Sequence, residues 1–359
     1  MADLFDPIRI GGLHCPNRIW MAPMTRGRAT REHVPTDLMA QYYAQRASAG
    51  LIISEATGIS LEGSGWPFAP GLWSAEQQQH WRTVTDAVHR AGGRIFAQLW
   101  HMGRLVHPSL HGINPVSASA TKVSGEAHTY AGKKPYVTAR PLHRGEIPRV
   151  IDDYVKAARH AISAGFDGVQ LHAANGYLID QFLLDGSNHR DDEYGGPIEN
   201  RLRLLKEVTQ ALVQTVGAER TAVRLSPNGA IQGVDDSNQD ALFPAAASAL
   251  NELRIAFLEL REPGPHGSFG KSDRPAVAPL IRPRFEGVLV LNSDYDLGRA
   301  RAALESGAAD AIAFGRSFLA NPDLPRRFKA GLPLNADDAG TWYTQGPEGY
   351  VTYPTAPSL

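Results

Sequence analysis

The residues with most chemical potential are polar hydrogen-bonding side chains placed where short apolar runs end. They are Thr25, Gln98, His101, His172, Asn175, Tyr177, Arg224, Asn292, Ser293 and Gly315 with Arg316. The set offers neutral donors, arginines and a tyrosine, but neither paired carboxylates nor a nucleophilic cysteine beside a base. It indicates a site that grips a planar, phosphorylated cofactor and leaves the covalent chemistry to that cofactor.

Taken singly, each of these residues also has an ordinary structural explanation. His172 could be a buried core histidine, Asn175 could belong to a turn, and Arg224 could be half of an ion pair. Gly315-Arg316 could bind phosphate through backbone N–H groups and a guanidinium, or could be a turn followed by a surface arginine. The functional interpretation gains weight because the donors collect at the same end of successive strands. No metal site is expected, since His172 has no acidic neighbours at these strand ends.

Eight apolar runs predict the strands that position these residues. They are Ile19–Pro23, Leu51–Glu55, Arg94–Trp100, Gly168–His172, Thr221–Ser226, Phe257–Arg261, Val288–Asn292 and Ala311–Phe314. Their near-continuous apolar character is typical of parallel strands covered on both faces. Amphipathic stretches alternate with them, which predicts an α/β protein with a closed (β/α)8 TIM barrel. A doubly wound sheet is the alternative, weakened because no GxGxxG sequence follows the first strand.

Helix ends are also visible in the sequence. Ser74 and Gln77 form a capping-box pattern ahead of a helix that extends to Ala91. Further helices are expected over 148–164 and 197–216, each opened by a proline. Asn321 followed by Pro322 predicts the start of a late helix.

One connection is unusually long. Residues 101–147, rich in Ser, Gly, Pro and His, separate the third strand from the next helix. Such a loop is either a functional capping subdomain over the carboxyl ends of the strands or a mobile surface insertion. We expect one barrel over residues 1–359, with 101–147 as a capping segment within it.

Composition excludes several classes of protein. The 359 residues carry 36 Lys and Arg against 37 Asp and Glu, a formal net charge of -1, which argues against nucleic-acid binding. The single cysteine, Cys15, excludes intrachain disulfides and cysteine-ligated iron–sulfur clusters. The N-terminus lacks the apolar core of a signal peptide, and no apolar run approaches a membrane span. A cytoplasmic location is therefore expected.

Sequence motifs along the whole chain resemble the old yellow enzyme family. The matching segments are Asn17-Arg18-Ile19, Met21 through Arg26, Gln98 through His101 with Gly103-Arg104, Ala164 through Gly168, His172 through Phe182, Ser187 through Arg190, Tyr194 through Pro197, Asn200-Arg201, Arg224 through Pro227, Phe314 through Arg316, Ala320 through Leu324, Gly349-Tyr350 and Tyr353-Pro354.

The resemblance implies an FMN-containing (β/α)8 barrel, with FMN bound tightly but not covalently. It implies an NAD(P)H-driven ene-reductase, which takes hydride from NADPH or NADH and passes it to an alkene activated by a carbonyl, nitro or similar group. Enones, maleimides and nitroalkenes are the expected substrates. Two alternatives stay open: a nitro-compound or nitrate-ester reductase on the same fold, and a flavin-binding barrel without reductase activity. The state of assembly is expected to be monomer or homodimer.

The resemblance also assigns roles residue by residue. His172 and Asn175 would donate to the substrate's carbonyl oxygen, and Tyr177 would deliver the proton. The residues implied at the cofactor are Pro23, Met24, Thr25, Ala56, Gln98, Arg224, Ser293, Gly315 and Arg316, and those implied at the substrate pocket are Trp66, Trp100 and Tyr343.

Some positions indicate one branch of the family, and others depart from the family pattern. Thr25 and Trp100 resemble the branch of the yeast enzymes and the bacterial N-ethylmaleimide and nitrate-ester reductases. Ser293 stands where the family generally carries glycine, so a positive φ there would be strained. Gln170 stands where an acid is expected, and the sequence offers no reason for the change.

Overall fold

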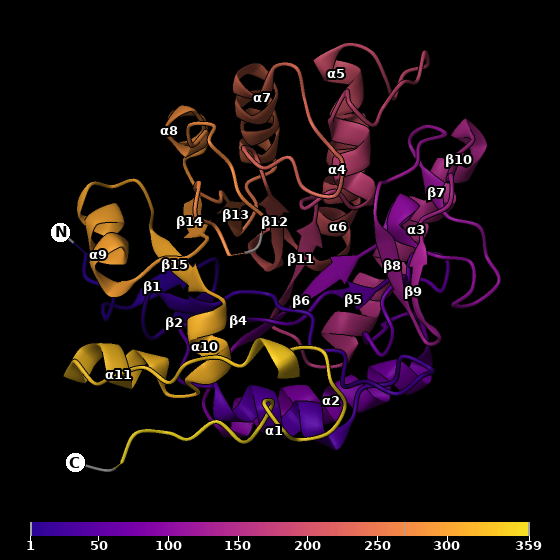
Figure 1. The fold of residues 1–359 in the computed structure, drawn as a ribbon. Coiled ribbons are helices and arrows are strands. Elements are labelled where there is room, and N and C mark those ends of the chain that lie inside the picture. The colour runs from indigo at the N-terminus through magenta and orange to yellow at the C-terminus, as the bar shows by residue number, and fades with distance from the viewer. Residues whose placement is uncertain (1, 269, 358–359) are drawn as a thin grey trace.

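Eight parallel strands form a closed barrel in the computed structural model, which describes residues 2–268 and 270–357 (Figure 1). In order they are β3 (Ile19–Met21), β4 (Ile52–Ile53), β6 (Ile95–Trp100), β11 (Gly168–His172), β12 (Thr221–Leu225), β13 (Phe257–Arg261), β14 (Val288–Asn292) and β15 (Ala311–Phe314). The ring closes because β15 pairs with β3 and β6 pairs with β11. A short strand, β5 (Thr57–Gly58), adds to the end of β6. The predicted (β/α)8 barrel is confirmed.

Helices surround the barrel (Figure 1). The longer ones are α1 (Asp37–Gln45), α2 (Ala75–Arg90), α3 (Ile147–Ser163), α6 (Arg203–Val216), α7 (Gln239–Glu252), α9 (Leu297–Glu305) and α11 (Leu324–Ala330), and the shorter ones are α4 (Leu178–Leu183), α5 (Ile198–Arg201), α8 (Ala278–Ile281) and α10 (Arg316–Ala320). The expected capping box at Ser74 and Gln77 begins α2. The buried residues of α3 recur every three to four positions, which is the spacing of one helix face.

Two helix predictions need correction. The helix expected over 197–216 is interrupted at Leu202, which separates α5 from α6. Asn321 does not begin a helix but ends α10, and α11 begins after Asp323. The reason lies in the side chain of Asn321, which donates to the Ser317 carbonyl at 2.8 Å and accepts from the Asn335 N–H at 2.7 Å.

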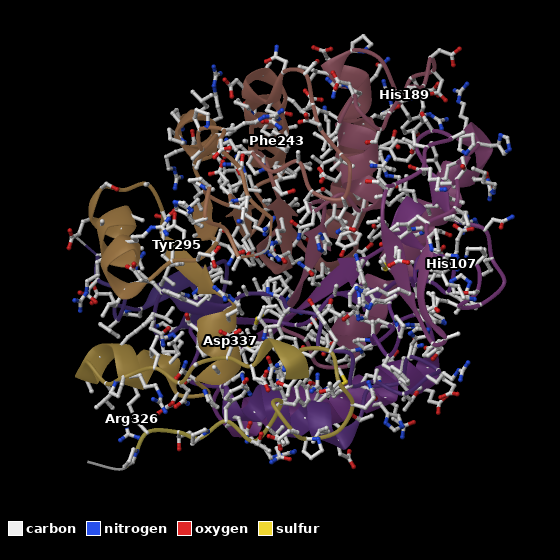
Figure 2. All side chains as sticks on the ribbon, in the orientation of Figure 1. His107, His189, Phe243, Tyr295, Arg326 and Asp337 are labelled. Carbon is white, nitrogen blue, oxygen red and sulfur yellow. The ribbon has the colours of Figure 1, made fainter. Side chains whose placement is uncertain are left out.

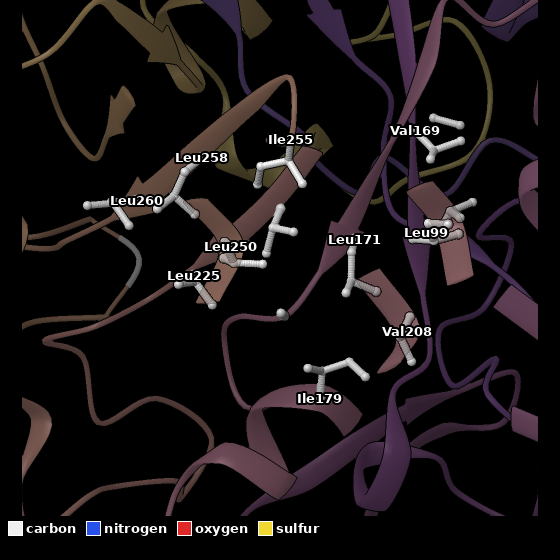
Figure 3. Packing of buried hydrophobic residues seen from close by; sticks show 14 of the residues in the cluster. Leu99, Val169, Leu171, Ile179, Val208, Leu225, Leu250, Ile255, Leu258 and Leu260 are labelled. Atoms are coloured by element: carbon white, nitrogen blue, oxygen red, sulfur yellow. The ribbon is translucent and has the colours of Figure 1, made fainter. Parts of the chain in front are cut away.

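Alternate strand residues face opposite sides of the barrel wall, which creates two apolar layers. The outer layer joins strand residues such as Leu171 and Leu258 to helix residues such as Val208 and Leu250 (Figure 3). The inner layer joins Phe96, Ala222 and Phe257 with other strand residues and with the hairpin β1 (Ile8–Ile10) and β2 (Leu13–Cys15). This N-terminal hairpin therefore closes the amino end of the barrel.

Close packing inside the barrel requires glycine at one position. A Cβ on Gly168 would lie 2.3 Å from the Phe96 ring, so the neighbouring strand leaves room only for glycine. This contact brings β6 and β11 together, and these strands carry Gln98 and His172 at their carboxyl ends.

Residues 101–147 leave the carboxyl end of β6 as a small folded unit. It contains η1 (Gly103–Leu105), the parallel pair β7 (Val116–Ser117) and β10 (Arg140–Pro141), the hairpin β8 (Glu126–Thr129) and β9 (Gly132–Pro135), and η2 (Arg144–Glu146).

None of the helices that the structure describes is both long and apolar enough to cross a membrane.

Candidate active site

A cavity of about 940 Å³ lies at the carboxyl ends of the barrel strands. Its wall includes nearly all of the residues that the sequence assigned to a site: Pro23, Met24, Thr25, Ala56, Trp66, Gln98, His172, Asn175, Tyr177, Arg224, Ser293, Gly315, Arg316 and Tyr343. Trp100 is not in this wall. It is buried behind Tyr177, whose ring packs edge-on against it with centroids 5.0 Å apart.

A row of buried polar side chains crosses the barrel interior, and three of its members, Gln98, Arg224 and Asn292, line the cavity. Gln98 Nε2 donates to Gln170 Oε1 at 2.8 Å, and Gln170 Nε2 donates to Glu259 Oε2 at 2.7 Å. Glu259 Oε1 lies 3.4 Å from Arg224 Nε, and Arg224 Nη2 donates to Asn292 Oδ1 at 2.6 Å. These residues come from five consecutive strands and share the inward-facing positions.

These hydrogen bonds explain why Gln170 stands where an acid was expected. The negative charge comes from Glu259, two strands away, and Gln170 connects it to Gln98. Arg224 is fully buried, and that desolvation lowers its pKa while Glu259 opposes the shift. The carboxylate therefore supplies the countercharge that a buried guanidinium requires.

The loop between β11 and α4 holds the proposed catalytic groups. Asn175 has a φ of 59°, a conformation that asparagine tolerates better than most residues. Its backbone N–H donates to Ser226 Oγ and its carbonyl accepts from Gln232 Nε2, both at 2.8 Å. His172 and Tyr177 flank Asn175, with their ring centroids 4.8 Å apart in an edge-on arrangement.

Burial sets the protonation states of two of these groups. Desolvation, together with Arg224 and Arg261, lowers the pKa of His172 well below its usual value, so the imidazole is neutral. Desolvation raises the pKa of Tyr177 to about 12, although Gln232 opposes the shift. A neutral imidazole offers one N–H donor, and a protonated phenol keeps a proton to give. His172 Nδ1 is also buried with no hydrogen-bond partner in the part of the chain that the structure describes.

The expected phosphate-binding positions also belong to the cavity wall. Ser293 has a φ of 130° and Asp294 a φ of 49°, so the turn after β14 holds two non-glycine residues at positive φ. Arg316 begins α10 and is half exposed. It forms ion pairs with Asp294 at 3.2 Å and with Asp337 of the C-terminal segment at 3.9 Å; Asp337 is labelled in Figure 2.

Aromatic rings from three distant segments meet at another part of the wall. Trp66 lies 4.4 Å from the His128 ring and 5.0 Å from the Tyr343 ring, measured between centroids. His128 belongs to hairpin strand β8. Segment 101–147 therefore contributes directly to the cavity wall, through His128, Glu126 and Tyr136.

Several residues of the cavity wall were not predicted from the sequence. Arg261, the last residue of β13, lines the cavity and donates from Nη1 to Asn175 Oδ1 at 3.2 Å. The signal that could have found Arg261 is its place at the end of an apolar strand, the same rule that selected His172. Gln232 and His128 carry no such signal, because both lie in irregular or inserted segments.

The donor set fits FMN. The buried amide of Gln98 and the buried guanidinium of Arg224 line the cavity, where they would hold the carbonyl oxygens and ring nitrogens of a flavin. Arg316 and the turn at Ser293 lie together at another part of the same wall, where a cation and backbone N–H groups suit a phosphate. The volume lies within the range of about 300–1,000 Å³ typical of ligand sites.

Comparison with known proteins agrees with this geometry. The model of the NADH:flavin oxidoreductase / NADH oxidase family matches residues 3–335. A probable flavin mononucleotide-dependent alkene reductase of Leishmania infantum is 44% identical over 360 residues, covering 98% of this chain and 97% of that protein. A putative 12-oxophytodienoate reductase 3 of Oryza sativa subsp. japonica is 42% identical, covering 98% and 92%.

Solved structures match over the whole chain. An old yellow enzyme homologue from Zymomonas mobilis has a TM-score of 0.98 and 63% sequence identity, covering 98% of this chain and 99% of that one. Morphinone reductase in complex with tetrahydroNAD has a TM-score of 0.94 and 42% identity, covering 99% and 98%. The expected family and reaction class are confirmed: the chain belongs to the NADH:flavin oxidoreductase / NADH oxidase family and is an FMN-dependent oxidoreductase of the old yellow enzyme kind.

Proposed function

We propose that the chain is an ene-reductase in which His172 and Asn175 bind the activating oxygen of an alkene and Tyr177 protonates the α-carbon. Bound FMN would supply the redox chemistry, hydride transfer from NADPH or NADH to the β-carbon of the alkene. The observation that carries this proposal is the juxtaposition of the neutral His172, Asn175 and the protonated Tyr177 in one cavity wall.

His172 and Asn175 act on the charge that develops during the reaction. Hydride addition to the β-carbon builds negative charge on the activating oxygen. Donors that are already in place stabilise this charge more than they stabilise the neutral substrate, so they accelerate the chemical step. The hydrogen bonds that fix the Asn175 backbone support such preorganisation.

Tyr177 supplies the proton that completes the reduction. Its phenol stays protonated at neutral pH, because burial raises its pKa to about 12. It lies two residues beyond Asn175 on the same loop, which supports delivery to the carbon adjacent to the activating group.

The remaining wall residues are proposed to hold the cofactor and cover the substrate. Gln98 and Arg224 would face the flavin ring, Thr25 would donate to a flavin carbonyl, and Gly315 with Arg316 would hold the phosphate. Pro23, Met24, Ala56 and Ser293 would complete this cofactor surface. Trp66 and Tyr343 would wall the substrate pocket, and segment 101–147 would cap it. Trp100 would support Tyr177 from behind.

The visible spectrum tests the proposal directly. A para-substituted phenol, ionised against His172 and Asn175, should produce a new long-wavelength band in the yellow holoenzyme. A colourless protein that stays colourless with added FMN, or a yellow protein without the new band, contradicts the proposal.

Tyr177→Phe should separate the two halves of the reaction. We expect NADPH to bleach the flavin at an unchanged rate, while reoxidation by cyclohexenone slows by about 10²–10⁴-fold because the general acid is lost. Stopped-flow absorbance measures both steps. Tyr130→Phe removes a hydroxyl outside the cavity and should change neither; equal reoxidation rates in Tyr177→Phe and the parent would contradict the assignment.

Activated alkenes such as enones, maleimides and nitroalkenes are the proposed substrates, and a substrate panel with nitrate esters distinguishes the related nitro-compound or nitrate-ester reductase. A cytoplasmic location and a monomeric or homodimeric state stay predictions of the sequence.

A further inference from the structure

Arg261 occupies a position in the barrel that gives it access to the catalytic loop. Along β13, alternate residues face inward, so Arg261 lies one layer above Glu259, toward the carboxyl end of the barrel. It is 4% exposed and lines the cavity together with His172. Burial and the neighbouring Arg224 lower its pKa to about 10, so the guanidinium is still charged at neutral pH.

The contact between Arg261 and Asn175 has only one possible polarity. A guanidinium has N–H donors and no acceptor, so Arg261 Nη1 at 3.2 Å selects the oxygen of the Asn175 carboxamide. The Asn175 backbone is already held by Ser226 and Gln232. The two side-chain torsions of Asn175 are therefore the remaining freedom, and the hydrogen bond from Arg261 restrains the orientation of its carboxamide.

The other half of the carboxamide is then turned away from Arg261. Within residues 2–268 and 270–357, no side chain or carbonyl accepts a hydrogen bond from Asn175 Nδ2. Asn175 lies in the cavity wall, so this NH2 group is available to a ligand oxygen.

We propose that Arg261 is a positioning residue that fixes the Asn175 carboxamide as a hydrogen-bond donor to an anionic or developing-anionic ligand oxygen. The charge also polarises the amide, which strengthens the hydrogen bond that Nδ2 gives. This inference rests on the proposed role of Asn175. It adds that oxyanion binding depends on a cation that does not itself touch the ligand.

Three substitutions of Arg261 distinguish orientation of the Asn175 carboxamide from simple filling of space. Arg261→Lys keeps a charged side chain with donors only, Arg261→Gln offers both donor and acceptor, and Arg261→Met offers neither. In the purified holoenzyme, para-chlorophenol titration of the long-wavelength band gives a dissociation constant. We expect Arg261→Met and Arg261→Gln to weaken phenol binding by about tenfold or more, and Arg261→Lys to restore most of it.

Turnover gives a second readout. With cyclohexenone, Arg261→Met should reduce kcat by up to about 10²-fold, the typical effect of losing an oxyanion donor. Reduction of the flavin by NADPH should change by less than about twofold. FMN content and thermal midpoint verify that each variant folds, and Arg274→Met, an exposed arginine on the following segment, is the matched control.

A double-mutant cycle decides whether Arg261 acts through Asn175. In an Asn175→Ala background, adding Arg261→Met should have almost no further effect on phenol affinity, because the group to be positioned is gone. If the losses of phenol affinity in the two single variants multiply in the double variant, Arg261 contacts the ligand directly, and the inference is overturned. Unchanged phenol affinity in Arg261→Met overturns it as well, while the proposed function stands. A parent holoenzyme without the phenol band overturns the proposed oxyanion site and this inference together.

Discussion

Asp180 supports the catalytic loop from the buried side of the cavity. Its Oδ2 accepts the backbone N–H of Gly176 at 2.8 Å and lies 3.5 Å from Ser226 Oγ. Burial raises the pKa of Asp180 to about 7, far above the ordinary value of 3.8. The carboxyl therefore holds the loop while it is mostly protonated below neutral pH, and ionisation places a buried negative charge beside Gly176 that the nearby Arg104 only partly offsets.

The raised pKa of Asp180 predicts a pH dependence of stability. Between pH 4 and pH 7 the folded chain keeps a proton that the unfolded chain has lost, so this contribution to stability is complete below about pH 4 and disappears as the pH approaches 7. Asp180→Asn keeps an acceptor for Gly176 without titrating. The free energy of unfolding should then fall less steeply with pH, by up to about 1.4 kcal/mol per pH unit. Denaturant unfolding at pH 5 and pH 7 measures this; parallel profiles for parent and variant would contradict it.

The turn after β14 bends sharply beside the site and carries backbone strain. Two successive residues at positive φ let the chain bend sharply from the barrel wall toward α9 (Figure 1). Glycine adopts such conformations freely, whereas serine at φ 130° is strained. Asp294 also accepts from Ser268, which ties this turn to the loop after β13.

Ser293→Gly should relieve the strain in this turn. We expect a gain in stability of about 1 kcal/mol, with FMN retained at least as tightly, because the backbone N–H groups keep their places. Thermal unfolding and FMN release during dilution measure the two effects. Ser293→Ala is the matched control, since it removes the hydroxyl and keeps the strain. Equal stabilisation by both substitutions would show that the hydroxyl, and not φ, is responsible.

The whole molecule encloses its single thiol at the end of the barrel opposite the cavity. Cys15 ends β2, is fully buried and packs among the inward-facing apolar residues of the strands. Burial raises the pKa of its thiol to about 12, so very little reactive thiolate exists at neutral pH.

Cys15 should therefore report the unfolding of the whole chain. We expect no reaction of the native protein with a disulfide reagent, and one thiol per chain after unfolding in guanidinium. N-ethylmaleimide, a proposed substrate, should be reduced through many turnovers without alkylating the protein. Mass spectrometry after turnover measures this. Alkylation of Cys15 in the native state would show that the N-terminal hairpin opens separately from the barrel.

The amino-acid sequence by itself determined most of the barrel and most of the candidate site. Val288–Asn292 and Ala311–Phe314 were predicted correctly because strands covered on both faces must be apolar throughout. His172 and Arg224 were found because parallel strands bring their carboxyl ends to one face, wherever they lie in the chain.

Only the tertiary structure decided how side chains pair across the barrel. Glu259 and Gln170 are 89 positions apart, and the closed barrel brings their side chains to 2.7 Å although strand register aligns Gln170, through Ala222, with Phe257. The contact between Arg261 and Asn175 joins the end of β13 to a loop after β11, and the position of Trp100 depends on how Tyr177 packs. The physical reason is that burial and periodicity are local properties that a sequence displays. The partner of a buried charge is a neighbour in space, and closure of the barrel selects it.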